Sequence, residues 1–98
     1  MRQFRVQVQD EAAEDLIEIW AEIAVHNPLA ADKYLGKLDG RIDSLYLMPE
    51  RGVPRDNLLP GLRMLAEGNH MIYYRVSNKR VEIMRVIHGS QDTTRLFS

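Results

Sequence analysis

The spacing of the apolar residues changes once along this chain, and that change limits the folds open to it. Between residues 10 and 45, apolar side chains recur three or four positions apart, which predicts two amphipathic helices. Residues 62–88 instead hold three runs of strand-forming residues, separated by short dipeptides at residues 68–69 and 78–79. Because Gly-Asn and Asn-Lys are compatible with tight hairpin turns, the second half predicts a three-stranded antiparallel meander.

One strand precedes the helices. Residues 4–9 alternate strictly between apolar and polar side chains, which indicates a half-buried strand. Asp10 follows as the expected N-cap of a first helix that runs to about residue 26, with acids in its first turn. Asn27 and Pro28 are then expected to cap and begin the second helix, which ends before residue 49.

Two glycines, Gly36 and Gly40, lie four residues apart inside the second helix. Each weakens a helix by about 1 kcal/mol relative to alanine. We expect them to allow a close approach of the first helix. Residues 49–61 contain three prolines and two glycines and are predicted to form a loop.

The expected fold class is therefore α+β, in the order β-α-α-β-β-β, as a single domain over residues 1–98. A helical hairpin should pack on one face of a small antiparallel sheet. With only two helices, the other face is expected to stay open.

A two-residue turn at Asn78 and Lys79 sets a testable register, in which Arg75 faces Glu82. The row expected to face the helices comprises Ile72, Tyr74, Val76, Val81, Ile83 and Ile87. The opposite row comprises Met71, Tyr73, Arg75, Glu82, Met84, Val86 and His88. Arg85 then falls in the helix-facing row, where it needs an acid, and the first helix is the expected source. The face on which Arg63 lies stays open, because one residue more or less in the preceding turn reverses it.

Composition excludes several classes of protein. The chain has 98 residues and no cysteine, so a disulfide framework and a thiolate metal site are both excluded. Its three histidines lack metal-ligand spacing, and no glycine-rich phosphate loop is present. No apolar run approaches the roughly 18 residues of a membrane span, and the first ten residues lack the apolar block of a signal peptide. We expect a cytoplasmic protein with no membrane contact, no cofactor and no small-molecule substrate.

The net charge of −1 is unevenly distributed. Residues 10–26 carry six acids and no basic side chain, whereas residues 51–98 carry eight basic side chains against four acids. A basic half attracts nucleic acid or an acidic protein, although an unevenly charged solvated surface gives the same pattern.

Metal-free RNA cleavage is one chemistry that the residues leave open. It needs a base for the 2′-hydroxyl, cations for the phosphate and an acid for the leaving oxygen. The candidates are Arg63, Arg75, Arg85, Tyr73, His70 and His88. Each also has a structural interpretation, as a sheet residue, a cross-strand ion pair or a hydrogen-bonded scaffold.

The strand, two helices, proline-rich loop and meander together resemble the ParE/RelE toxins of bacterial toxin–antitoxin pairs. The resemblance covers nearly the whole chain and is most specific in "GLRML", residues 61–65, and "IMRVIHGSQD", residues 83–92. An aliphatic strand that carries Arg-Val-x-His-Gly is typical of the ParE branch.

The RelE branch implies a ribosome-dependent messenger RNA endonuclease with basic residues on the sheet and a tyrosine in the C-terminal tail. Matched by position, the third-strand arginine of that pattern falls at Met71, the arginine after the last strand near Gln91, and the tail tyrosine at Phe97. Of the positions compared, only residue 63 carries a basic side chain where the nuclease pattern has one. We therefore expect no catalytic residues and no metal site.

The ParE branch implies an inhibitor of DNA gyrase that traps the enzyme with cleaved DNA and is neutralised by a ParD-like antitoxin. A RelE-type nuclease and a non-toxic homologue that only binds its antitoxin are the alternatives. The tail from Ser90 to Ser98 is expected to pack or dock. The predicted target-binding residues are Arg63, Arg75, Arg85, His88, Arg95, Leu96 and Phe97.

Overall fold

The computed structural model describes residues 4–97. Its elements are β1 (Arg5–Val8), α1 (Asp10–Ala24), α2 (Pro28–Ser44), β2 (Val53–Pro54), β3 (Leu62–Glu67), β4 (His70–Ser77) and β5 (Arg80–His88). The predicted elements are all present, and β2 is an additional short strand inside the predicted loop. The expectations for residues 1–3 and for Ser98 lie outside the described residues.

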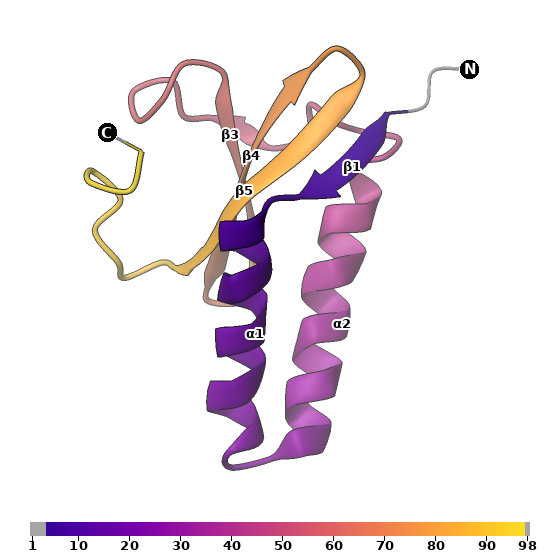
Figure 1. The fold of residues 1–98 in the computed structure, drawn as a ribbon, viewed down its shortest axis with the longest axis vertical. Helices are drawn as coiled ribbons and strands as arrows, with labels where there is room; N and C mark the ends of the chain where they lie inside the picture. The colour runs from indigo at the N-terminus through magenta and orange to yellow at the C-terminus, as the bar shows by residue number, and fades with distance from the viewer. Residues whose placement is uncertain (1–3, 98) are drawn as a thin grey trace.

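The five strands form one sheet in the order β1-β5-β4-β3-β2, and the helical hairpin packs on one of its faces (Figure 1). The pairs β2–β3, β3–β4 and β4–β5 are antiparallel, as expected. β1, however, runs parallel to β5, so the sheet is mixed and the expectation of a wholly antiparallel sheet was wrong in this respect. The reason is topological: the chain crosses from β1 to the far edge of the sheet, and the meander then returns to place β5 beside β1.

The starts of the two helices differ. Gln9, not Asp10, is the N-cap of α1, and its side chain makes no capping hydrogen bond. Asp10 is instead the first helical residue, where its negative carboxylate still interacts favourably with the positive end of the helix dipole. At α2 the prediction is confirmed, because the Asn27 side chain accepts a hydrogen bond of 3.1 Å from the backbone N–H of Ala30.

The two glycines of α2 do not mediate close packing. Gly36 and Gly40 are both exposed, and a Cβ added at either would meet no heavy atom within 4 Å. The expectation that they bring the helices together was therefore wrong, since both lie on the side of α2 that faces solvent.

The turn between β4 and β5 has the predicted form. Asn78 and Lys79 both have positive φ, at 49° and 60°, which matches the twist of the adjoining strands in a two-residue hairpin. This turn sets Arg75 opposite Glu82, as expected.

A β-bulge further along β5 alters the register. Tyr74 faces Ile83, but Tyr73 faces Arg85, so Met84 is the extra residue. Beyond it two side chains lie on the face opposite to the expected one: Val86 joins the helix-facing core, whereas the side chain of Ile87 lies on the other face. The expected faces of these two residues were therefore wrong.

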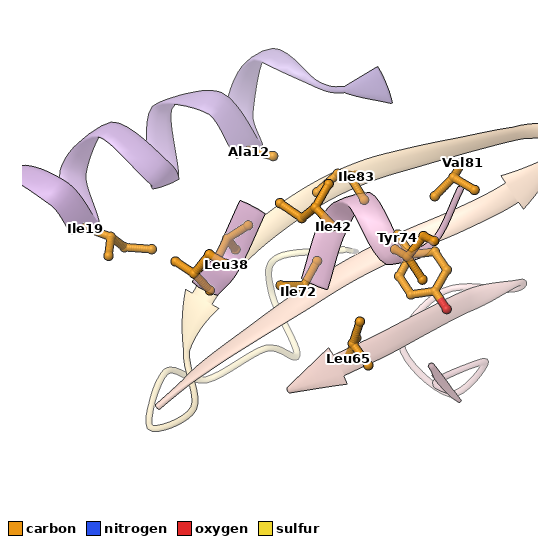
Figure 2. Packing of buried hydrophobic residues seen from close by; sticks show 11 residues of the cluster. Ala12, Ile19, Leu38, Ile42, Leu65, Ile72, Tyr74, Val81 and Ile83 are labelled. Carbon is orange, nitrogen blue, oxygen red and sulfur yellow. The ribbon is translucent and has the colours of Figure 1, made fainter. Parts of the chain in front are cut away.

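The main core lies between the sheet and the helices (Figure 2). Its buried members are Ala12, Ile19, Leu38, Ile42, Leu45, Leu65, Ile72, Tyr74, Val81, Ile83 and Val86. A second cluster, on the opposite face, is built on Leu62, Tyr73 and Ile87. Half-buried side chains cover it: Leu58, Leu59, Met64, Met71, Met84, Leu96 and Phe97. The face expected to stay open is thus partly closed by the loop before β3 and by the C-terminal tail, and we call it the second face.

Over residues 4–97, neither helix has the length and apolar character that a membrane span requires.

Candidate functional site

Arg85 is held by α1 through a two-point ion pair. Its Nε and Nη2 donate to the Asp15 carboxylate at 2.8 and 3.0 Å, and the same carboxylate accepts from the Val86 backbone N–H at 2.9 Å. The hydrogen bond to Asp15 raises the pKa of Arg85, against the opposing effect of burial. The expected acid of the first helix is present, and Arg85 therefore joins the bulged end of β5 to α1.

Arg63 lies on the helix-facing side of β3, opposite Tyr74. Its Nη1 donates to the carbonyl oxygens of Glu50 and Gly52 at 3.0 and 2.7 Å. The Tyr74 hydroxyl accepts from the Gly52 N–H at 2.8 Å, and a Cβ on Gly52 would lie 2.6 Å from that hydroxyl oxygen. Arg63 and Tyr74 thus fix the loop that leads into β2.

The other two predicted arginines lie elsewhere. Arg75 faces Glu82 on the opposite side of the sheet, where both border a hollow of about 290 Å³ with Gln9 and Met84. Arg95 lies exposed in the tail. The predicted arginines are therefore divided among the second face, the tail and the helix side of the sheet, and do not converge on one phosphate-sized site.

His88 and His70 meet at the end of the sheet near α1, with ring centroids 5.4 Å apart in an edge-on arrangement. They border a cleft of about 360 Å³ whose α1 side carries Glu18 and Glu22. The Tyr34 hydroxyl lies 2.6 Å from His70 Nδ1. Burial lowers the pKa of His70, the neighbouring His88 lowers it further, and Glu22 opposes both.

The start of the tail is fastened to His88. Its Nδ1 accepts from the Ser90 N–H at 3.1 Å, and the Gln91 side-chain oxygen accepts from the His88 N–H at 2.9 Å. His88 therefore holds the turn that leads away from β5, which is the scaffold role that was one of its two interpretations.

The end of the tail packs on the second face. The Phe97 and Tyr73 rings have centroids 5.2 Å apart and are tilted by 56°, while Leu96 and Met71 pack against the same cluster. The tail therefore packs through Leu96 and Phe97, one of the two outcomes expected for it. In residues 4–97, no group of three or more His, Cys, Asp or Glu residues could hold a metal ion.

Comparison with known proteins identifies the family. The family model described as "ParE toxin of type II toxin-antitoxin system, parDE" matches residues 6–93. The chain belongs to the ParE toxin family. A curated relative, Toxin ParE1 of Caulobacter vibrioides, is 37% identical over 94 residues, which cover 94% of each chain. Toxin ParE1 of Mycobacterium tuberculosis is 35% identical over 66 residues, which cover 66% of this chain and 67% of that protein.

Solved structures agree with this ParE toxin in fold. A structure described as "Chromosomal ParDE TA system from P. aeruginosa" has a TM-score of 0.77 and 23% identity, covering 90% of this chain and 98% of that one. The toxin–antitoxin complex RelBE2 of Mycobacterium tuberculosis has a TM-score of 0.59 and 24% identity, covering 88% and 98%. These likenesses confirm the RelE/ParE-like α+β fold, with two helices on one sheet.

Two residues that organise the region around His88 and Arg85 were not singled out from the sequence. Asp15 was only one of several acids on the first helix, yet it lies three residues after Ala12 and four before Ile19, in the buried row. An acid at a position within the apolar row of the helix was the sequence signal that could have identified Asp15. Tyr34, which contacts His70 across 36 positions, left no comparable trace in the sequence.

Proposed function

We propose that this ParE toxin inhibits DNA gyrase by binding it with its cleaved DNA, in the cytoplasm, and that a ParD-like antitoxin neutralises it. Membership of the ParE family supports the target. The observation that carries a binding mechanism, rather than RNA cleavage, is the packing of Phe97 on Tyr73 beside Met71.

This packing matters because of the positions involved. Met71 and Phe97 stand where the resemblance to the nuclease branch implies an arginine and a proton-donating tyrosine. A thioether holds no phosphate and a phenyl ring donates no proton. In addition, Arg63 donates to two loop carbonyls and Arg85 to Asp15, so both guanidinium groups already have acceptors inside the protein.

Two assays on the purified chain test the mechanism. We expect inhibition of gyrase supercoiling, with cleaved DNA accumulating, and no codon-linked cleavage of messenger RNA in translating ribosomes. Cleavage at the ribosomal A site would contradict the proposal in favour of the nuclease. Absence of both activities, together with normal growth of cells that express the chain alone, would favour the non-toxic homologue that only binds its antitoxin.

We propose that target contact lies on the second face and the tail. Arg75, Leu96 and Phe97 lie on this side and Arg95 lies in the tail, whereas Arg63, Arg85 and His88 lie on the helix side. Arginine is enriched among residues that dominate interface energies, and positive charge favours a DNA-bound target.

Truncation tests this assignment. Removing residues 90–98 should abolish inhibition while the chain stays folded, as checked by circular dichroism. The double variant Glu14→Lys/Glu18→Lys, on the exposed side of α1, should inhibit nearly as well as the parent. Full inhibition by a truncated chain that melts as the parent does would remove the tail from the site.

The antitoxin partner is supported by the structural neighbours, one described as a ParDE system and one as a toxin–antitoxin complex. We propose that the antitoxin wraps this toxin with an amphipathic helix and an extended segment whose acids meet the basic half of the chain. Co-expression with the protein encoded beside it should restore growth and give a stable complex. A toxin that is harmless alone and binds no such protein would contradict this partner.

A further inference from the structure

β1 is an edge strand with one unused side (Figure 1). The N–H groups of Arg5 and Gln9 donate to Lys79 and Ile83 of the neighbouring strand region at 2.8 and 2.9 Å. Backbone groups alternate in direction along a strand, so those of the intervening Val6 and Val8 point away from the sheet. Within the described chain, β1 pairs only with β5.

Apolar side chains gather beside this free edge. Val8 is 42% exposed, and Leu47 and Met48, which follow α2, are 65% and 55% exposed. The latter two line a hollow of about 350 Å³ together with Phe4, at the start of β1. A free strand edge next to exposed apolar residues favours association with another strand, because only a strand satisfies the edge's N–H and C=O groups.

The charges along this segment indicate which strand fits. Arg5 stands at its start, residues 6–9 are uncharged, and Asp10 and Glu11 follow at the first turn of α1. A segment that is basic at one end and acidic at the other is complementary to itself in an antiparallel alignment.

We propose that β1 is a self-association edge, on which a second copy of this chain pairs its own β1 antiparallel about a two-fold axis at Gln7. Val6 then faces Val8 of the second copy, and Val8 faces Val6 of the second copy. Each pair exchanges two N–H···O bonds, and Arg5 approaches the acidic end of the other copy. The two five-stranded sheets become continuous.

Other alignments fit less well. An axis at Val8 would place the outward-facing groups of Val6 against Asp10, which already belongs to α1. An axis at Val6 would leave Val8 facing Phe4, which precedes the strand. Only the axis at Gln7 uses the outward groups of both valines within the strand, and it opposes no two like charges.

The interface is small, because the shared edge is only four residues long. It lies below the roughly 1,600 Å² of a standard protein interface, so we expect a weak, rapidly exchanging dimer with a dissociation constant on the order of 10–100 μM. This inference does not depend on the proposed inhibition of gyrase.

Charge exchange at the axis provides the first test. Gln7 is exposed and would face its own counterpart, so Gln7→Lys and Gln7→Glu each place like charges together. Sedimentation of the purified chain should show dimerisation weakened about tenfold in each variant, and restored when the two are mixed. Asn57→Lys, an exposed loop variant, is the matched control and should dimerise as the parent does. Melting curves check that each variant is folded.

A disulfide provides the second test, since the chain has no cysteine. Residues that face each other without mutual hydrogen bonds have Cα atoms about 4.5 Å apart, within the range of a disulfide. Gln7→Cys should therefore form covalent dimers on mild oxidation much faster than Asn57→Cys. A parent chain that stays monomeric at about 500 μM, well above the expected dissociation constant, would overturn the inference. Failure of the Lys and Glu variants to associate when mixed, or equal oxidation rates for the two cysteine variants, would overturn it as well.

Discussion

The two faces of the sheet are closed by different kinds of side chain. The helix-facing side is filled by fully buried residues such as Ile72, Tyr74 and Ile83, each with no exposed surface. Among residues 4–97 the cluster on the second face has three buried members, and half-buried leucines, methionines and the end of the tail cover them. Methionine is flexible and repacks easily. The comparison indicates that the helix side contributes most of the buried core, while the second face is covered mainly by half-buried side chains.

The arginines on the two faces also differ in how they are held. Arg85, on the helix side, has two hydrogen bonds to Asp15, and its side chain is only 20% exposed. Arg75, on the second face, is placed opposite Glu82 by register. The first arginine is part of the packing between α1 and β5, and the second is half-buried on the second face.

The largest expected effect comes from neighbouring residues on opposite faces. Ile72→Ala should lower the free energy of unfolding by about 2–5 kcal/mol, because it leaves a cavity in a close-packed core. Met71→Ala, one position earlier and only half-buried, should cost about 1 kcal/mol. Urea denaturation of both variants measures the difference. Equal losses would mean that the second face is as firmly packed as the first.

The next effect compares the two arginine environments. Asp15→Asn removes the charge that pairs with Arg85 and should cost about 2 kcal/mol. A fully buried pair would cost more, about 3–5 kcal/mol, but here the guanidinium group retains some contact with water. Arg75→Gln should change stability by less than about 0.5 kcal/mol. Both are measured by denaturant titration at neutral pH, and a larger loss for Arg75→Gln would reverse the assignment of the two arginines.

These contrasts also show which features the sequence could predict. The register of β4 and β5 followed from the turn at Asn78 and Lys79, whose positive φ values suit a two-residue hairpin. The bulge at Met84 was not predictable, because two alternations of apolar residues fit equally well on either side of it. Val86 and Ile87 were consequently assigned to the wrong faces.

The pairing of strands that are distant in the sequence was the other feature that the sequence did not predict. Periodicity gives the elements but not the partner of an edge strand, so the parallel pairing of β1 with β5 had no local signal. For the candidate site, an acid of α1 was expected near Arg85, but which one depended on the position of the bulge. The close approach predicted at Gly36 and Gly40 was wrong, since glycine spacing alone does not say which side of a helix is covered.

A smaller effect concerns the closure of the second face by the tail. Phe97→Ala removes the ring that packs on Tyr73 and should cost about 1 kcal/mol. It should also increase the binding of a dye that reports exposed apolar surface. Leu29→Ala, at the start of α2 and 80% exposed, is the matched control and should change neither property. Unchanged melting and dye binding for Phe97→Ala would mean that the tail does not close this face in solution.

The smallest effect is the pH dependence that His70 gives to the helix-facing side. Burial and the nearby His88 lower the pKa of His70, whereas in the unfolded chain a histidine titrates near 6.5. The unfolded chain therefore binds more protons than the folded chain just below that pH. The stability that neutral His70 provides is full above about pH 6.5 and is lost as the pH falls through the lower pKa of the folded state.

His70→Gln should remove this part of the pH dependence while retaining a polar side chain near Tyr34. The free energy of unfolding, measured in urea from about pH 7.5 down to about pH 5.5, should fall less steeply in the variant than in the parent. His26→Gln, in the exposed turn after α1, controls for the loss of a histidine as such. If His70→Gln and the parent lose stability in parallel over this range, protonation of His70 is not coupled to unfolding.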